Sequence, residues 1–156
     1  KEKIKIPLIA AGGIANGRGM LAAMVLGADG VQVGSRFAAS VESSAHENFK
    51  KKILETKEGE TQVTLKELAP VRLIKNKFYQ DVQDLYAKCP TKEELATLLG
   101  RARAKHGMFE GDLDEGELEI GQIAGLIHAI KPAAEIISEM ITDYNLARKE
   151  VEKFDF

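Results

Sequence analysis

The sequence has no tryptophan, only one cysteine and only four prolines among its 156 residues. A single cysteine cannot form a disulfide within the chain, which favours a reducing compartment and predicts a cytoplasmic location. The sequence also lacks a signal peptide and any apolar run approaching the length of a membrane span. A formal net charge of −2 argues against strong binding to nucleic acid or to a membrane surface. These absences leave a globular chain the size of one ordinary domain.

Groups that could catalyse a reaction on their own are also scarce. His46, His106 and His128 show no metal-ligand spacing, so no metal site is predicted. There is no Gly-x-Ser-x-Gly elbow, Walker loop or His-Glu-x-x-His motif. Cys89 precedes a proline, and no neighbour would activate its thiol as a nucleophile. The pattern suits an enzyme whose chemistry belongs to a bound cofactor.

The most informative stretch lies near the start of the sequence, where two short apolar runs each end in glycine. Pro7–Ala10 and Gly30–Val33 are predicted to be buried parallel strands. Gly17–Leu26 between them is rich in helix formers, with Asn16 as a suitable N-cap and Gly27 as a stop. Together these segments predict a strand–helix–strand unit.

The glycines at the two strand ends predict a phosphate site. Gly12 and Gly13 follow the first strand, and Gly34 and Ser35 follow the second. Glycine lets backbone N–H groups approach an anion closely. In (β/α)8 barrels phosphates bind in the loops after strands seven and eight, often against a short extra helix. Residues 35–39 are candidates for that helix, with the Ser35 hydroxyl as a further donor; the alternative is that the glycines only permit tight turns.

The middle of the chain predicts one hairpin and several helices. Thr61–Leu65 and Val71–Ile74 are β-prone and are expected to pair outside the main sheet. Ser44 and Glu47 form a capping-box pattern for a helix that ends near residue 55, with Lys50–Lys52 on its solvated face. Further helices are expected over 76–88, over 91–99 behind a second capping box, from Gly121, and over 133–149.

Two expectations concern the later part of the chain. The glycine-rich, acidic stretch Gly107–Gly116 lacks the spacing of a calcium loop and is interpreted as a mobile loop near a site. The final helix is expected to pack outside the domain core with these residues buried: Ile136, Ile137, Met140, Ile141, Tyr144 and Ala147.

A family resemblance rests on particular segments. Ile6–Ile14, Leu26–Phe37 and Gly121–Leu126 resemble the FMN-dependent TIM-barrel family of nitronate monooxygenases and type II enoyl-acyl-carrier-protein reductases. Ser44–Leu54 and Gly111–Gly116 are more similar to the enoyl reductase branch. The resemblance covers essentially the whole chain but only the last part of the family's barrel.

The resemblance implies an α/β fold, the C-terminal portion of a (β/α)8 barrel with an added, mostly helical C-terminal region. Residues 1–56 would form its last two β/α units, 57–120 an excursion, and 121–156 helices returning to the barrel. The strands and catalytic histidine that precede these units in the family are expected to lie before this chain. A lone strand–helix–strand unit has an uncovered sheet edge, which agrees with that expectation.

The resemblance also implies a cofactor site. The FMN phosphate would be held at Gly12, Gly13, Gly34 and Ser35, and Gln122 would lie in a turn near the flavin ring. In the reductases NAD(P)H reduces FMN, which passes hydride to a trans-2-enoyl thioester carried by acyl-carrier protein or CoA. Nitronate monooxygenases instead oxidise alkyl nitronates with O2 and need no nicotinamide. A non-catalytic phosphate-binding module is a third reading, and a homodimer is one assembly that the resemblance allows.

Overall fold

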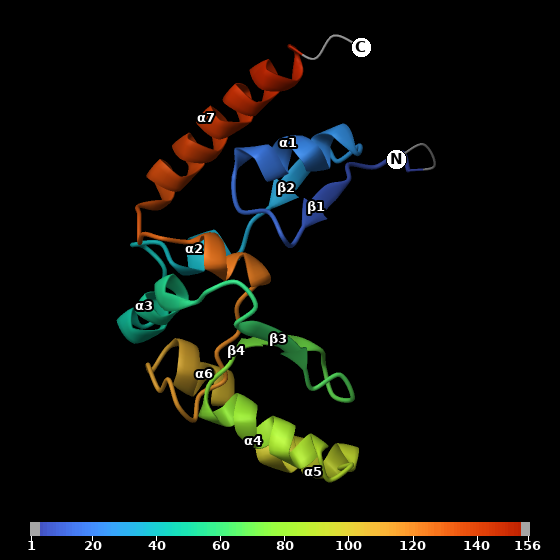
Figure 1. The fold of residues 1–156 in the computed structure, drawn as a ribbon, viewed down its shortest axis with the longest axis vertical. Helices are drawn as coiled ribbons and strands as arrows, with labels where there is room; N and C mark the ends of the chain where they lie inside the picture. Colours follow the sequence, from blue (N-terminus) through green and yellow to red (C-terminus); the bar gives the residue numbers. More distant parts are fainter. Residues whose placement is uncertain (1–3, 154–156) are drawn as a thin grey trace.

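The computed structural model describes residues 4–153 as an elongated α/β chain (Figure 1). Its elements, in chain order, are β1 (Ile9–Ala11), α1 (Gly17–Val25), β2 (Gly30–Gln32), α2 (Ser35–Ala38), α3 (Glu47–Glu55), β3 (Thr61–Thr64), β4 (Val71–Ile74), α4 (Lys77–Tyr86), α5 (Lys92–Leu99), α6 (Arg103–Met108), the 3₁₀ helix η1 (Gln122–Leu126) and α7 (Ala133–Val151). Helices α1 and α7 lie side by side at one end, and α4 and α5 at the other. Within the described range, no helix is long and apolar enough to cross a membrane.

We call β1, α1, β2, α2 and α7 the parallel unit. Strands β1 and β2 pair in parallel, with Ile9 opposite Gly30, and α1 connects them as predicted. The Asn16 side chain caps α1 by accepting a hydrogen bond from the Gly19 N–H at 3.0 Å. Gly17 lies against the backbone of α7, where a Cβ would fall 2.1 Å from the Tyr144 nitrogen. The sequence thus fixes both the beginning of α1 and its close approach to α7.

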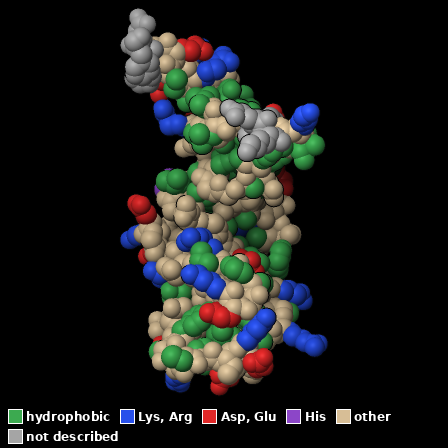
Figure 2. Space-filling view, turned by 90° about the vertical axis from the view of Figure 1, so that its right-hand side faces the viewer, with side chains coloured by type: hydrophobic (Ala, Val, Ile, Leu, Met, Phe, Trp, Pro, Cys, Tyr) green, Lys and Arg blue, Asp and Glu red, His purple; other side chains and the backbone are tan. Residues whose placement is uncertain are grey.

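The prediction that both strands are buried is wrong for the described residues. Ile9 is 53% exposed, and Val25 and Leu26 at the end of α1 are 76% and 85% exposed. The reason is that the sheet of the parallel unit has two strands, and no further strand among residues 4–153 pairs with either edge. Figure 2 shows hydrophobic side chains on the surface at this end, together with charged side chains of both signs.

We call β3, β4, α4, α5 and α6 the appended lobe. Strands β3 and β4 form the predicted antiparallel hairpin, with Thr61 opposite Ile74. The predicted capping box of α5 is confirmed, because the Thr91 hydroxyl and the Glu94 carboxylate each accept a backbone N–H of the other residue. The lobe encloses its own core of fully buried side chains: Leu65, Leu73, Phe78, Val82 and Leu95.

Two predictions for α3 are wrong. The helix begins at Glu47 and not after Ser44, and its N-cap is His46, whose Nδ1 accepts the Asn48 N–H at 3.1 Å. An imidazole nitrogen can replace a hydroxyl as acceptor at this position, because a cap needs only an oxygen or nitrogen lone pair. Lys50, predicted to be solvated, is buried because its ammonium reaches the Val41 carbonyl at 3.3 Å and Glu47 at 3.1 Å.

The later elements also differ in part from expectation. The segment that begins at Gly121 is a short 3₁₀ helix, and it packs so closely that a Cβ on Gly125 would lie 3.0 Å from the Glu58 nitrogen. In α7, Ile136, Met140 and Ala147 are buried as predicted. Ile137 and Ile141 are exposed and Tyr144 is half-buried, because α7 packs mainly against α1, on one side of its axis.

The acidic stretch 107–116 is held in place by hydrogen bonds, contrary to the predicted mobile loop. The Asn76 amide donates to the carbonyls of Leu113 at 2.9 Å and Gly116 at 2.8 Å. The Asp112 carboxylate accepts backbone N–H groups inside the turn. Short polar side chains of this kind satisfy turn backbone groups that would otherwise need water.

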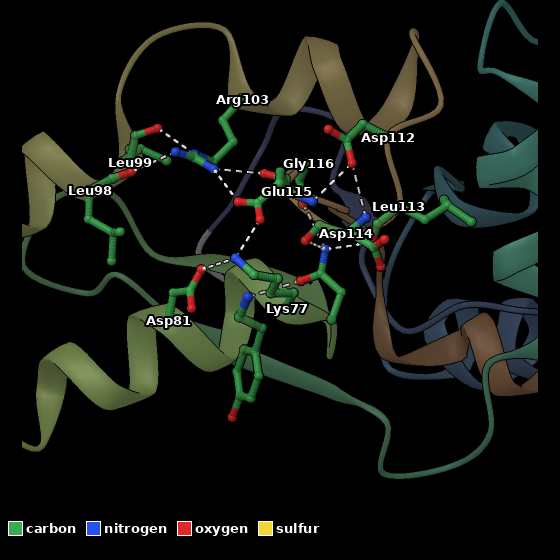
Figure 3. Close-up of polar contacts among 12 residues, drawn as sticks. Lys77, Asp81, Leu98, Leu99, Arg103, Asp112, Leu113, Asp114, Glu115 and Gly116 are labelled. Atoms are coloured by element: carbon green, nitrogen blue, oxygen red, sulfur yellow. Dashed lines mark hydrogen bonds and ion pairs between the residues drawn. The ribbon is translucent and has the colours of Figure 1, made fainter.

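A polar network joins this stretch to the lobe's helices (Figure 3). Lys77 pairs with Asp81 at 3.1 Å and with Glu115. The Arg103 guanidinium donates to the carbonyls of Leu99 and Glu115, both at 2.8 Å, and lies 4.5 Å from the centroid of the Phe78 ring. The network therefore connects α4, α5 and α6 above the buried aromatic core.

Candidate functional site

The carboxyl ends of β1 and β2 open on a pocket of about 680 Å³, which we call the glycine pocket. Its lining residues are Gly12, Gly13, Gly34, Ser35, Ala38, Pro70, Val71, Arg72, Glu119, Ile120, Gly121 and Gln122. All five residues singled out in the sequence lie on it: the four at the strand ends and Gln122 at the start of η1. The fold thus brings together three segments that are far apart in the chain (Figure 1).

The backbone explains why glycine occupies the strand end after β1. Gly12 and Gly13 have φ angles of +89° and +73°, in the left-handed region that side chains other than glycine rarely adopt. A Cβ placed at Gly12, Gly13 or Gly34 would meet no atom within 4 Å, so each glycine leaves open space beside its backbone. Because these glycines line one pocket from two neighbouring strands, the space suits an anion held by backbone N–H groups.

Ser35 joins two walls of the glycine pocket. Its Oγ accepts the Gly121 N–H at 3.0 Å, which ties the first residue of α2 to the residue before η1. A hydroxyl that accepts in this way keeps its own proton, and it can donate that proton to a ligand oxygen. Ser35 therefore both lines the pocket and fixes the position of the turn that carries Gln122.

Arg36 follows Ser35 directly but turns away from the glycine pocket. Its guanidinium donates to the Glu139 carboxylate on α7 at 2.9 Å, and its side chain is 14% exposed. Lys131 pairs with the same carboxylate and, as the largest influence, lowers the pKa of Glu139 below its usual range. Arg36 therefore connects α2 to α7, and it supplies no charge to the pocket.

The sequence analysis did not identify two charged residues of the pocket, Arg72 and Glu119. Arg72 lies in β4, and the segment around Glu119 runs beside this strand, with the Ile120 N–H donating to the Arg72 carbonyl at 3.1 Å. A signal for Arg72 was present, because it is the charged residue inside the apolar run Val71–Ile74. A charged side chain in an edge hairpin is more often solvated, so the pattern alone does not reveal a pocket.

A second cavity of about 600 Å³ adjoins the first, and we call it the hairpin groove. It is lined by Gly13, Glu58, Gly59, Thr61, Arg72, Gln122, Ile123, Gly125 and Leu126. Gly13, Arg72 and Gln122 line both cavities. Each is within the size range of cofactor and substrate sites, so the two together can hold a cofactor and a second molecule.

One buried carboxylate, Glu117, lies against α6, where its backbone N–H donates to the Arg103 carbonyl at 3.1 Å. Glu117 is 6% exposed, and burial, with repulsion from Glu119, raises its pKa to about 7 despite the opposing charge of Arg103. Glu117 does not line the pocket itself. Among residues 4–153, no group of three or more His, Cys, Asp or Glu side chains is placed to hold a metal ion.

Comparison with known proteins supplies family context for this geometry. Residues 1–143 match the model of the nitronate monooxygenase family. A protein from Staphylococcus aureus described as a probable nitronate monooxygenase is 36% identical over 148 residues, which is 92% of this chain and 40% of the relative.

Two solved structures share the fold. FabK from Thermotoga maritima superimposes with a TM-score of 0.89 at 38% identity, covering 97% of this chain and 48% of that one. Nitroalkane oxidase from Streptomyces ansochromogenes superimposes with a TM-score of 0.73 at 27% identity, covering 96% of this chain and 42% of that one. The chain thus spans less than half the length of these relatives.

Proposed function

This chain belongs to the nitronate monooxygenase family, and we propose that it is the phosphate-holding part of an FMN-dependent enoyl thioester reductase. The observation that carries the proposal is the glycine pocket at the ends of two parallel strands, with a second cavity beside it. The likeness of nearly the whole chain to FabK supports the reductase branch over the nitroalkane oxidase, which superimposes less closely. In this proposal the preceding strands and the catalytic residue belong to the rest of the whole protein.

The residues of the glycine pocket fit an FMN phosphate. Gly12, Gly13 and Gly34 leave backbone open to the pocket, and the Ser35 hydroxyl can donate to a phosphate oxygen while accepting from Gly121. Ser35 also places Gln122, whose turn would border the flavin ring in this arrangement. Bound FMN would supply the hydride chemistry, because no acid, base or nucleophile of the pocket can transfer hydride by itself.

In this proposal NAD(P)H is the reductant, and an enoyl group carried by acyl-carrier protein or CoA is the acceptor. The hairpin groove is the space for the second molecule, because it shares Gly13, Arg72 and Gln122 with the glycine pocket. Ile123 and Leu126 give this groove apolar surface, which suits an acyl or pantetheine-like chain. The groove walls would orient that chain toward the flavin turn and keep water from it.

A nitronate monooxygenase is the second candidate, because the curated relatives bear that name. The two activities differ in their reductant, because the reductase uses NAD(P)H and the monooxygenase does not. We would record the visible spectrum of the full-length protein without oxygen, add NADH or NADPH, and then add a crotonyl thioester. Flavin bands that bleach with nicotinamide and return with the thioester support the reductase. Bands that bleach only with a nitronate support the monooxygenase, and a colourless protein that FMN does not reconstitute supports a non-catalytic phosphate-binding module.

The cofactor site itself is tested by Gly34→Asp. An aspartate there places a negative side chain in space that now holds no atom within 4 Å of the added Cβ, so it should repel a phosphate. We expect the full-length variant to lose at least nine-tenths of its FMN, measured as the ratio of flavin to protein absorbance. Gly19→Asp is the control, because a Cβ at Gly19 has no neighbour closer than 3.7 Å, its φ is ordinary and it lies outside the pocket. Equal FMN retention in both variants would overturn the assignment.

A further inference from the structure

Arg72 stands at the boundary between the two cavities. It lines both the glycine pocket and the hairpin groove, together with Gly13 and Gln122. Arg72 is the only positively charged residue lining either cavity among the described residues. An anion that enters the hairpin groove would therefore meet this guanidinium.

The guanidinium is anchored without being neutralised. Its Nη1 donates to the carbonyl and to the hydroxyl of Thr61 across the hairpin, both at 3.1 Å. Both acceptors are uncharged, and no carboxylate of residues 4–153 lies within 4.0 Å of this guanidinium as an ion-pair partner. Because an arginine has five N–H donors, those on Nε and Nη2 are left for a ligand. An anchored planar fork of this kind recognises phosphate better than a mobile lysine does.

The proposed FMN phosphate site at the strand ends does not require the charge of Arg72. Gly12, Gly34 and Ser35 line only the glycine pocket, where backbone and hydroxyl donors serve a phosphate. Apart from Arg72, the hairpin groove is lined by one charged residue, Glu58, and its other lining residues are uncharged, with Ile123 and Leu126 apolar. The groove therefore offers an extended, partly apolar path that ends at one positive charge.

We propose that Arg72 binds the phosphate of a second, phosphorylated substrate in the hairpin groove, distinct from the FMN phosphate. The proposal rests on the function proposed above and adds the residue that selects the substrate. That phosphate has two chemical sources in the proposed reaction, the pantetheine arm of the thioester and the nicotinamide dinucleotide. Arginine recognition of a phosphate is the chemistry common to both.

The test measures binding and does not require turnover. Full-length, FMN-loaded protein is titrated calorimetrically with 4′-phosphopantetheine, with pantetheine and with NAD⁺. We expect Arg72→Gln to weaken the binding of phosphopantetheine or of NAD⁺ at least tenfold. The affinity for pantetheine and the FMN content should not change. Weaker binding of phosphopantetheine assigns the site to the thioester arm, and weaker binding of NAD⁺ assigns it to the dinucleotide.

Two further variants separate recognition from general effects. Arg101→Gln removes the same charge from an exposed arginine outside both cavities, and it should change none of these affinities. Thr61→Val removes one of the two anchors of Nη1, so it should weaken the same ligand as Arg72→Gln by a smaller factor.

The proposal is overturned if Arg72→Gln changes neither phosphorylated ligand, or if Arg101→Gln weakens them equally. It is also overturned if Arg72→Gln releases FMN, which would place Arg72 in the cofactor site, or if it raises only the KM for a nitronate. A protein that binds phosphopantetheine through Arg72 but transfers no hydride would instead contradict the proposed function and leave this site standing.

Discussion

The parallel unit and the appended lobe bury their apolar side chains to very different extents. In the lobe, Leu65, Leu73, Phe78, Val82 and Leu95 are each at most 1% exposed. In the parallel unit Ile9 and Val25 are more than half exposed, although this unit carries the strand-end glycines. The lobe therefore has a closed core of its own, although Ile74 of β4 also packs in a shared core with Ala15 and Ala39. The parallel unit has apolar surface left over for further packing.

The polar contacts show the same difference. The lobe's network of Asn76, Lys77, Arg103 and Glu115 connects its helices and its acidic turn to one another (Figure 3). In the parallel unit, α7 is held by the close backbone approach of Gly17, by the ion pair of Arg18 with Glu150 and by the pair of Arg36 with Glu139. Binding sites commonly lie where packing is incomplete, and here the two cavities lie between the two regions.

Removing the centre of the lobe's core should have the largest effect on stability. Phe78 is fully buried and contacts the Arg103 guanidinium, so Phe78→Ala loses its burial and leaves a cavity. We expect a loss of about 3–5 kcal/mol in the free energy of unfolding, measured by urea denaturation. Hydrogen exchange should accelerate first in β3, β4 and α4. Phe109→Ala, at a residue 49% exposed, is the control and should cost far less.

The close approach of α1 to α7 can be broken by a single methyl group. In Gly17→Ala the new Cβ would lie 2.1 Å from the Tyr144 nitrogen and 2.2 Å from the Met140 carbonyl oxygen. Because both atoms belong to backbone, α7 must move, and we expect a destabilisation of about 3 kcal/mol. Gly19→Ala is the matched control in the same helix, since its Cβ would have no neighbour nearer than 3.7 Å. If both variants unfold at the same urea concentration, the proposed contact does not hold α7 in place.

The sequence predicted most where structure depends on local chemistry. Asn16, Thr91 and the glycines after β1 each specify a cap or a turn through one side chain or one φ angle, and the structure has them as expected. The meeting of Gly12 and Gly34 at one pocket followed from the rule that parallel strands end at one edge of a sheet, whereas Gln122 was placed there only by the family resemblance. Caps, turns and strand ends of this kind are determined by a few residues that are neighbours in the sequence.

The errors arose where a residue's environment is set by distant segments. Ser44 and His46 can both cap a helix, and the fold selects His46, whose N–H donates to the Met108 carbonyl at 2.8 Å. Lys50 is buried because the Val41 carbonyl happens to accept its ammonium. Arg72 was missed because it becomes a pocket residue only through the position of the hairpin against the parallel unit. The sequence of β4 alone does not predict that position.

The segment packed against α6 gives the smallest but most specific prediction, because Glu117 is buried there with a pKa raised to about 7. A carboxyl group with a pKa of 4.5 when unfolded and about 7 when folded binds more protons in the folded state between these values. Stability should therefore fall as the pH rises from about 4.5 to about 7, by about 2–3 kcal/mol. Glu117→Gln should flatten this part of the profile, measured by urea denaturation at several pH values. Glu115→Gln, at a half-exposed carboxylate of the lobe's network, should leave the slope unchanged. An identical slope in the Glu117→Gln protein would mean that another group titrates in this range and that the Glu117 carboxyl is not the cause of the slope.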